Sequence, residues 1–451
     1  MSADLDQSII SPDFATPDPL NNDELECVPA PDGQSVSPQI NEVIDTPAYK
    51  ITVTQKKPDD LKIDIDVDID LLVADAKNGN PEAMLIYGKV LFDGKIVPQN
   101  LHKAAYYFKQ AGKRGHAGAE MLYGFMLENG LGVDRDISKA VTHYGQSARL
   151  GNPAGHIKYG QCLDSGRGVQ QSRTGATKHF KAAAEAGHGL GCYYYGYALL
   201  KGRGVESKDL KLGSSYLKTA ADQGIPEAQH LYGYALINGV GVDKDETLGI
   251  KYVKDSIQND YSPALILYGE MLVAGRGVEK DYDQAFQLFQ KAADKGDSNG
   301  LNNIGKMYQL GYGVEKDETK AFEMFDKAAE RGNIQGMANL GICYLQGTGT
   351  LIQEDKAVKL FKFAAEQNNQ SAIILLGRCY ETGQGIRKNV KKAYQMYQKS
   401  ANLNNSVGLF NQGRCLIKGI GVKKNIEEAK TVLQKAADLG NNNAKKVLEQ
   451  L

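Results

Sequence analysis

Small and apolar residues recur along this chain with a period of about 36 residues, from Ala83 to the C-terminal end. In each period an Ala or Gly precedes a glycine by five positions, and a Leu or Tyr follows that glycine by three. Such spacings place the side chains on one face of an α-helix. We call the glycines of this pattern the ladder glycines: Gly88, Gly124, Gly160, Gly196, Gly233, Gly269, Gly305, Gly341, Gly377 and Gly413. Their regular period is typical of a solenoid.

A turn divides each repeat into two predicted helices. Six residues after the ladder glycine comes a second glycine, which in most repeats opens a Gly-x-Gly-Val sequence such as Gly130-Leu-Gly132-Val133. Glycine adopts the positive φ with which a chain leaves a helix and reverses direction. Good N-cap residues follow about six positions later, with Gln353 the exception. They are Asn100, Asp136, Ser172, Asp209, Asp245, Asp281, Asp317, Asn389 and Asn425.

The second helix carries a large side chain three positions before a pair of small residues, as in Phe361 with Ala364-Ala365. It is predicted to end at residues that tolerate a left-handed C-cap. These are Gly115, Gly151, Gly187, Gly224, Gly296, Gly332 and Gly440, with Asp260, Asn368 and Asn404 in place of glycine. A glycine inside a helix costs roughly 1 kcal/mol relative to alanine, so the ladder glycines indicate close helix contacts. The single 37-residue step places an insertion in the loop from Val205 to Lys208.

The combined pattern resembles the Sel-one-like repeat (SLR), a relative of the tetratricopeptide repeat. The resemblance extends from about residue 67 to the C-terminus, although Phe and Tyr stand where that family often has Trp-Tyr and the chain has no Trp. It implies an all-α fold, a right-handed α-α superhelix (solenoid) of about ten 36-residue helix-turn-helix repeats with half-repeat caps. We therefore expect one solenoid domain over residues 67–451.

The N-terminal segment has a different composition. Residues 1–50 contain ten Asp or Glu, one Lys and seven of the 13 prolines, which gives this segment a charge of −9. The whole chain carries −1, so the remainder carries −1 − (−9) = +8. A segment with so few large apolar residues buries too little surface to offset its ordering entropy. We expect a disordered, acidic, Pro-rich tail over residues 1–60.

Half repeats are expected to cap both ends of the solenoid. Counting 36 residues back from the second helix of the first repeat leads to residues 67–79, which follow the acidic stretch Asp64-Ile-Asp66-Val-Asp68-Ile-Asp70. We interpret the end of that stretch as the first turn of a capping helix, with a β-edge or an ion site as the alternative. At the other end, residues 441–451 form a matching half repeat around Ala444. Such ends cover the otherwise exposed core of a solenoid.

Composition argues against several classes of function. A charge of +8 over some 400 residues is too dilute for a nucleic-acid surface, and no helix has a Lys/Arg stripe with interleaved aromatics. No apolar run reaches the ~20 residues that span a bilayer, and the first residues do not form a secretory signal. Cys162, Cys343, Cys379 and Cys415 share one repeat position. Equivalent positions of stacked repeats lie about 10 Å apart, which is too far for a disulfide. Free thiols indicate a reducing compartment, so we expect a cytoplasmic protein.

We find no convergent catalytic or metal-binding motif in the sequence, and expect neither a cofactor nor a metal. His143 and His179 are 36 residues apart on second helices, where they replace the usual aromatic residue. We interpret this pair as packing groups. The Gly-x-Gly turns follow helices and lack the third glycine of a dinucleotide fingerprint.

Recognition is expected on the first helices, which line the inner curve of helical-hairpin solenoids. The position after the ladder glycine varies between repeats and includes Tyr197, Tyr234, Arg378 and Arg414. Three residues before this variable position, on the same helical face, stand Lys158, Tyr194, Asn303, Asn339 and Asn411, among others. The asparagines resemble those with which tetratricopeptide-type repeats hold a peptide backbone, and the alternative is local helix packing. The tyrosines suit an interface, and the two arginines suit an acidic segment.

These features predict a non-enzymatic adaptor or scaffold whose concave face binds a peptide or helix of partner proteins. The resemblance implies two alternatives. Some relatives regulate or activate a membrane-associated enzyme complex, and certain SLR proteins have been associated with β-lactam hydrolysis. The absence of paired cysteines counts against the second.

Overall fold

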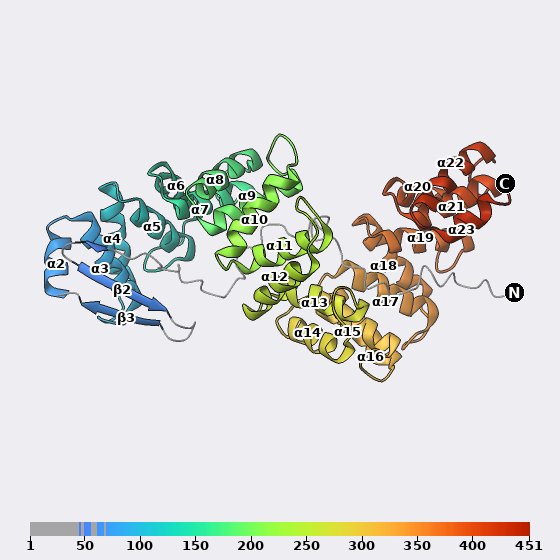
Figure 1. Cartoon of the computed structure of the whole chain (residues 1–451), viewed down its shortest axis with the longest axis horizontal. Coiled ribbons are helices and arrows are strands. Elements are labelled where there is room, and N and C mark those ends of the chain that lie inside the picture. Colours follow the sequence, from blue (N-terminus) through green and yellow to red (C-terminus); the bar gives the residue numbers. More distant parts are fainter. Residues whose placement is uncertain (1–44, 47–48, 56–60, 67–68) are drawn as a thin grey trace. The chain divides into compact units, whose positions relative to one another are not determined.

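The computed structural model describes residues 45–46, 49–55, 61–66 and 69–451 (Figure 1). Residues 69–451 form the predicted all-α helix-turn-helix repeats. Contacts between residues group these helices in two compact units that are built from the same kind of repeat. Helices α2 to α12 belong to the unit that ends at Asn259, and helices α13 to α23 belong to the unit that begins at Asp260.

Each repeat consists of two helices of 13 residues. The first helices are α3 (Pro81–Asp93), α5 (Ala117–Asn129), α7 (Pro153–Ser165), α9 (Gly189–Lys201), α11 (Pro226–Asn238), α13 (Ser262–Ala274), α15 (Ser298–Leu310), α17 (Ile334–Gln346), α19 (Gln370–Thr382) and α21 (Ser406–Lys418). The second helices are α4 (Leu101–Lys113), α6 (Ile137–Arg149), α8 (Arg173–Glu185), α10 (Leu210–Asp222), α12 (Glu246–Gln258), α14 (Tyr282–Asp294), α16 (Glu318–Glu330), α18 (Glu354–Glu366), α20 (Val390–Asn402) and α22 (Ile426–Asp438).

The helix ends form at the predicted residues. All nine predicted N-cap side chains accept a hydrogen bond from the backbone N–H three residues later, and Gln353 makes no such bond. The ten glycines that follow the first helices are in the left-handed region, as is Asp260 with φ 56°. The predicted insertion is also confirmed, because the loop between Lys201 and Leu210 is one residue longer than the loop between Ser165 and Arg173.

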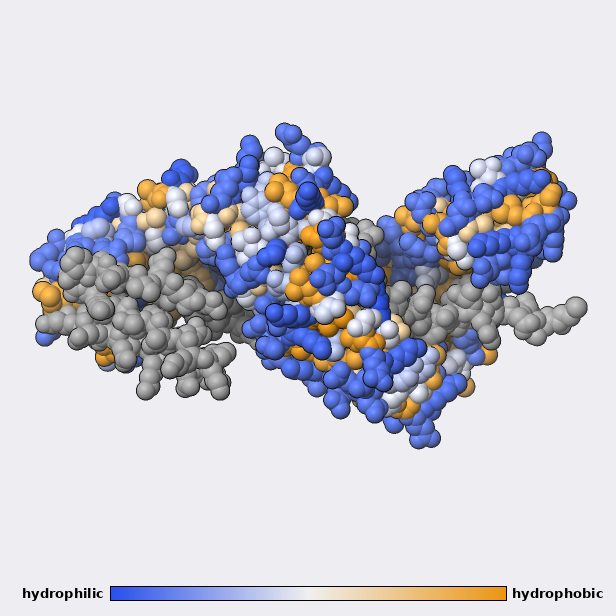
Figure 2. All heavy atoms as spheres, viewed as in Figure 1, coloured by the Kyte–Doolittle hydropathy of each residue, from blue (hydrophilic) through white to orange (hydrophobic). Residues whose placement is uncertain are grey.

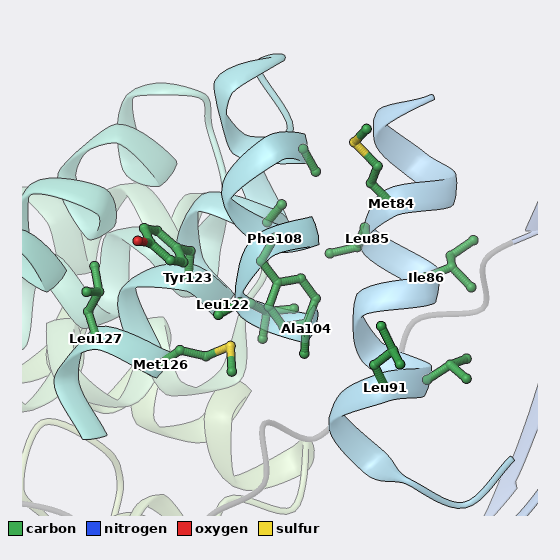
Figure 3. Packing of buried hydrophobic residues seen from close by; sticks show 14 of the residues in the cluster. Met84, Leu85, Ile86, Leu91, Ala104, Phe108, Leu122, Tyr123, Met126 and Leu127 are labelled. Carbon is green, nitrogen blue, oxygen red and sulfur yellow. The ribbon is translucent and has the colours of Figure 1, made fainter. Parts of the chain in front are cut away.

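The ladder glycines are the contact points between the two helices of each repeat. A Cβ added to Gly88 would lie 2.6 Å from Cε1 of Phe108, and one added to Gly341 would lie 2.5 Å from Cε1 of Phe361. Figure 3 shows Phe108 of α4 packed among residues such as Leu85 of α3 and Leu122 of α5. The interpretation of these glycines as close contacts is confirmed.

Two short half repeats flank the ten full repeats. Helix α2 (Ile69–Lys77) has Asp70 in its first turn and buries Leu72 and Ala76 in the core of the first repeats. Helix α23 (Asn442–Leu448) buries Ala444 and exposes Lys445 and Lys446. The predicted caps therefore form at both ends.

A three-stranded antiparallel sheet precedes the helices. Its strands are β1 (Asp45–Thr46), β2 (Tyr49–Gln55) and β3 (Leu61–Asp66), in the order β1-β2-β3, with Thr52 opposite Asp64. Strands β2 and β3 alternate polar and apolar residues in sequence, a pattern that favours strand pairing. Strands β1 and β2 lie within the segment 1–60 for which composition predicts a disordered tail, and the rest of that segment lies outside the described residues.

The acidic stretch that precedes the first cap is divided between two elements. Asp64 and Asp66 belong to β3, whereas Asp70 lies in the first turn of α2. The end of the stretch therefore begins the cap, as predicted. Its beginning pairs as a strand, which was the alternative interpretation.

Candidate functional site

All predicted site residues lie on one face of the first helices. Positions six and nine of a 13-residue helix are three residues apart and therefore project from the same side. We call these two positions in α3 to α21 the first-helix face. Position six carries Lys158, Tyr194, Asn303, Asn339 and Asn411, and position nine carries Tyr197, Tyr234, Arg378 and Arg414.

The tyrosines on α9 form a connected aromatic cluster. Tyr194 stacks on Phe180 of α8 with ring centres 4.8 Å apart, and its hydroxyl accepts a hydrogen bond of 2.7 Å from Nε2 of Gln161. Tyr197 is half-buried, and Nζ of Lys201 lies 5.6 Å from the centre of its ring. The cluster joins the first-helix faces of α7 and α9 and leaves part of Tyr194 and Tyr197 accessible.

Lys158 and Tyr234 differ in accessibility. Lys158 is half-buried, and burial lowers the pKa of its ammonium group below the usual value. Tyr234 is only 7% exposed. Lys158 therefore presents surface to a partner on the helix before the aromatic cluster, whereas Tyr234 presents little.

In the unit that begins at Asp260, the first-helix face contains buried charges. Glu270 of α13 is 4% exposed and Lys306 of α15 is 6% exposed. Nδ2 of Asn303 donates a hydrogen bond of 3.1 Å to Oε1 of Glu270. Burial raises the pKa of the Glu270 carboxyl to about 7, although the positive charge of Lys306 and the Asn303 bond act in the opposite direction. Asn303 thus satisfies a buried carboxyl of the neighbouring repeat.

This carboxyl should make folding stability depend on pH. Between pH 4.5 and about 7, Glu270 holds its proton in the folded chain and loses it in the unfolded chain. The folded state then binds more protons, so the free energy of unfolding should fall by up to about 1.4 kcal/mol per pH unit as pH rises. Urea unfolding of wild type and Glu270→Gln at several pH values measures this, since the stability difference between them should change across that window. A constant difference would contradict the raised pKa.

The remaining asparagines also bond within the chain. Nδ2 of Asn339 donates to Oδ1 of Asn302 at 2.8 Å, and Nδ2 of Asn411 donates to the carbonyl of Val407 at 3.0 Å. Asn339 is half-buried, whereas Asn303 and Asn411 are buried. These bonds are what the helix-packing interpretation expects, and peptide binding by the asparagines stays a prediction.

Arg414 already has an acidic partner. Its Nη1 and Nη2 donate to Oε1 and Oε2 of Glu381 at 2.9 and 2.5 Å, and its guanidinium lies 5.9 Å from the ring centre of Tyr397. Burial raises the pKa of the Glu381 carboxyl, but the bidentate pair with Arg414 outweighs burial and holds that pKa below its usual value. The charge of Arg378 has a smaller effect in the same direction. The predicted basic patch of Arg378 and Arg414 is therefore partly neutralised by Glu381.

Sequence reasoning missed a row of asparagines that links successive first helices. Asn333, Asn369 and Asn405 each cap their own helix through Oδ1. Their Nδ2 atoms donate to the preceding first helix, at Oδ1 of Asn299, Oε1 of Gln335 and Oε1 of Gln370. The 36-residue recurrence of Asn at this position was the available signal.

His143 and His179 pack against aromatic rings, as predicted. Their rings make edge-on contacts with Tyr123 and Tyr159, at centre distances of 4.8 and 4.9 Å. A further contact was not predicted, since Nδ1 of His179 lies 2.9 Å from Nδ1 of His156. Burial lowers the pKa of both imidazoles.

The thiols offer no reactive group among the residues that the structure describes. Cys162, Cys192, Cys343, Cys379 and Cys415 are buried and free. Burial raises the pKa of each thiol, which lowers its nucleophilicity at neutral pH. Cys27 lies outside the described residues.

Nowhere in the described part of the chain do three or more His, Cys, Asp or Glu side chains gather closely enough to hold a metal ion. Across residues 69–451, none of the helices has both the length and the apolar character needed to cross a bilayer. Hydrophilic residues make up most of the coloured surface in Figure 2.

Known repeat proteins match this chain repeat by repeat. The Sel1 repeat family model matches ten segments: residues 81–116, 117–152, 153–188, 189–225, 226–254, 262–297, 298–333, 334–369, 370–405 and 406–441. A protective antigen of uropathogenic Escherichia coli strains, which displays an SLR fold, is 29% identical, with 85% of this chain and 82% of that chain covered and a TM-score of 0.56. A Sel1 repeat protein from Oxalobacter formigenes is 26% identical over 54% of this chain and 96% of that chain, with a TM-score of 0.48. No curated protein matches the chain.

Proposed function

This chain belongs to the Sel1 repeat family, and from that premise we propose that it is a non-enzymatic adaptor that binds a peptide or helix of a partner protein. The binding surface is the first-helix face, and its best-supported part lies on α5, α7 and α9. Neighbouring first helices contact one another there, so their side chains form one surface.

The observation that carries this proposal is a contrast between constant and variable positions. The ladder glycines and the left-handed glycines that end the first helices recur in every repeat because they build the fold. Position nine, by contrast, holds Phe125, Gln161 and Tyr197 in three successive repeats, all half-buried. A fold-building role alone would not require such variety, and aromatic and amide groups are suited to protein recognition.

The spacing of the helices limits the ligand. Packed helices lie about 8–10 Å apart, so a face built from three first helices spans roughly 20–30 Å. An extended peptide of about six to nine residues covers this length. A helix lying across the face would need about 13 to 20 residues.

Tyr197→Ala should weaken partner capture by at least about fivefold, because truncating one of the few residues that dominate an interface, among which tyrosines are enriched, costs more than about 1 kcal/mol. Quantitative crosslinking and pull-down with the full chain would compare this variant with wild type. Tyr106→Ala is the matched control, since Tyr106 is 57% exposed on the second helix α4, away from the first-helix face. Partners lost from Tyr197→Ala but kept by Tyr106→Ala support the proposal.

Two outcomes would contradict it. Equal partner recovery with both variants would remove the first-helix face from binding. Turnover of a substrate by the purified chain, abolished by one substitution, would overturn the non-enzymatic role. Arg414→Glu is unsuitable as a probe, because it would place a second carboxylate beside Glu381 and disturb the fold.

A further inference from the structure

Positive charge is concentrated in the last two repeats. Between Glu381 and Glu427 the chain contains nine Lys or Arg and no Asp or Glu. Two of the nine bind oxygen atoms of the same chain, since Arg414 pairs with Glu381 and Nζ of Lys399 donates to the carbonyl of Ala365. The other seven are exposed, and we call them the basic edge: Arg387, Lys388, Lys391, Lys392, Lys418, Lys423 and Lys424.

The loops that follow α19 and α21 differ from earlier loops of the same unit at equivalent repeat positions. The two residues before the N-cap are an acid and a base in the first two loops of the unit, as in Glu315-Lys316, and Nζ of Lys316 lies 2.9 Å from Oε1 of Glu318 on the following helix. The last two loops carry Arg387-Lys388 and Lys423-Lys424 at the same positions. These two loops are therefore doubly basic.

The acid that pairs with Lys316 also has no counterpart in these two loops. The positions equivalent to Glu318 are Val390 and Ile426. No described carboxylate forms an ion pair within 4.0 Å of a basic-edge cation. Lys392 contacts an aromatic ring instead, with its Nζ 5.5 Å from the ring centre of Tyr380, and stays exposed. The basic edge thus keeps its full charge.

In successive repeats these loops pack in the same way against the preceding repeat. A Cβ added to Gly421 would overlap the carbonyl oxygen of Val390, and the backbone N–H of Gly385 donates to Oε2 of Glu354 at 2.9 Å. Each loop therefore rests on the first turn of the second helix of the preceding repeat. Carboxylates close by in sequence are Glu427 and Glu428 in the first turn of α22, and Glu428 accepts a hydrogen bond from Asn425.

The loop between α17 and α18, one repeat before Arg387-Lys388, carries two apolar side chains at these positions. Leu351 is 81% exposed and Ile352 is 62% exposed, the two highest values among the exposed large apolar residues described. This loop is seated in the same way, because a Cβ added to Gly349 would overlap the carbonyl oxygen of Glu318. We call Leu351 and Ile352 the apolar tip. The loop that begins the basic edge rests on Glu354, two residues beyond this tip, so the two surfaces are continuous.

We propose that the apolar tip and the basic edge together dock on an anionic lipid bilayer. The cations contact the acidic headgroups, and Leu351 and Ile352 insert at the level between headgroups and acyl chains. Aliphatic side chains at a loop apex have no counterpart on a phosphodiester backbone, and the edge offers no aromatic row for stacking bases. Apart from Lys418, which follows Arg414 by one turn of α21, this surface lies in the loops and at the start of α20 and not on the first-helix face, so the inference does not rest on the proposed function.

Co-sedimentation of the full chain with vesicles tests this proposal. We expect binding to vesicles of equal parts phosphatidylcholine and phosphatidylserine, weakened by salt, and no binding to phosphatidylcholine alone. Each basic residue near such a surface changes the partition coefficient about fivefold, so Lys423→Gln/Lys424→Gln should lower it about 25-fold. Leu351→Ser/Ile352→Ser should lower it about tenfold.

Lys280→Gln/Lys316→Gln is the control, because it removes the same net charge from loops that also carry acids and should change binding little. Circular dichroism and thermal unfolding check that every variant is folded. Absence of binding to the anionic vesicles, or equal losses in the control and the Lys423→Gln/Lys424→Gln variant, would overturn the proposal. The proposal would also be overturned if the chain bound RNA or an acidic peptide but not the vesicles, and the Leu351→Ser/Ile352→Ser variant kept that binding. Tyr197→Ala should leave vesicle binding unchanged, which separates this test from that of the adaptor role.

Discussion

Replacing Lys306 with methionine should lower the free energy of unfolding by about 1–3 kcal/mol at pH 7, because it leaves the buried Glu270 carboxyl without its positive neighbour and with one hydrogen-bond donor. Lys306 and Glu270 are 6% and 4% exposed, so little water is available to solvate the Glu270 carboxyl, and its ionised form becomes still less favourable. Asn303 still donates to Glu270, but a single amide bond does not replace a positive charge. Urea or thermal unfolding of the full chain measures the loss.

Two comparisons separate this effect from a simple packing defect. The double variant Glu270→Met/Lys306→Met should recover most of the stability, because apolar replacements of both charges are often neutral. The loss in Lys306→Met should also shrink at pH 5, where Glu270 with its raised pKa takes up a proton. A loss that is the same at both pH values and in the double variant would show that the charges do not determine it.

Gly341→Ala should destabilise the chain by about 1–3 kcal/mol, as expected for an extra methyl group in a packed core. Alanine is favoured over glycine by roughly 1 kcal/mol in an exposed helix, so packing must reverse the sign of the change. The new Cβ would lie 2.5 Å from Cε1 of Phe361, whose side chain is fully buried. Denaturant unfolding monitored by circular dichroism measures the difference.

A compensating substitution tests the cause. Phe361→Leu should rescue part of the loss in Gly341→Ala, because Leu433 is the residue that faces the ladder glycine Gly413 in the last full repeat. Gly118→Ala is the control, since Gly118 lies in the first turn of α5 with its nearest neighbour atom 3.4 Å from an added Cβ. That control should be neutral or slightly stabilising. Additive effects of Gly341→Ala and Phe361→Leu would exclude the contact as the cause.

Most of the fold could be predicted because its determinants are local. An N-cap such as Asp317 acts within its own first turn, and a glycine such as Gly311 adopts its left-handed conformation within one turn of its helix. Strand β2 could not be predicted in this way, since the composition of residues 1–60 indicates disorder, and a strand was only the alternative interpretation of the stretch that begins at Asp64. The pairing of β2 with β3 joins residues as distant as Lys50 and Asp66.

The candidate site was less predictable. Sequence position placed Tyr197, Asn303 and Arg414 on one helical face, and the structure agrees. Whether each side chain is accessible depends on the neighbouring repeat: Asn303 is buried against Glu270, Arg414 is held by Glu381, and Tyr197 stays half-exposed. Partners that lie about one repeat away in sequence leave no local signal.

The repeated spacing of glycines, caps and small residues determined by itself that this protein is a row of helical hairpins, because each of those residues acts on its own turn or on the adjoining helix. Tertiary structure alone decided which charges are buried. The run of Lys and Arg between Glu381 and Glu427 is present in the sequence, but its placement in loops that pack against preceding repeats is not. Each loop packs against the preceding repeat, as the contact between Gly421 and Val390 shows. Loops one period apart are therefore aligned, and their cations lie along one edge.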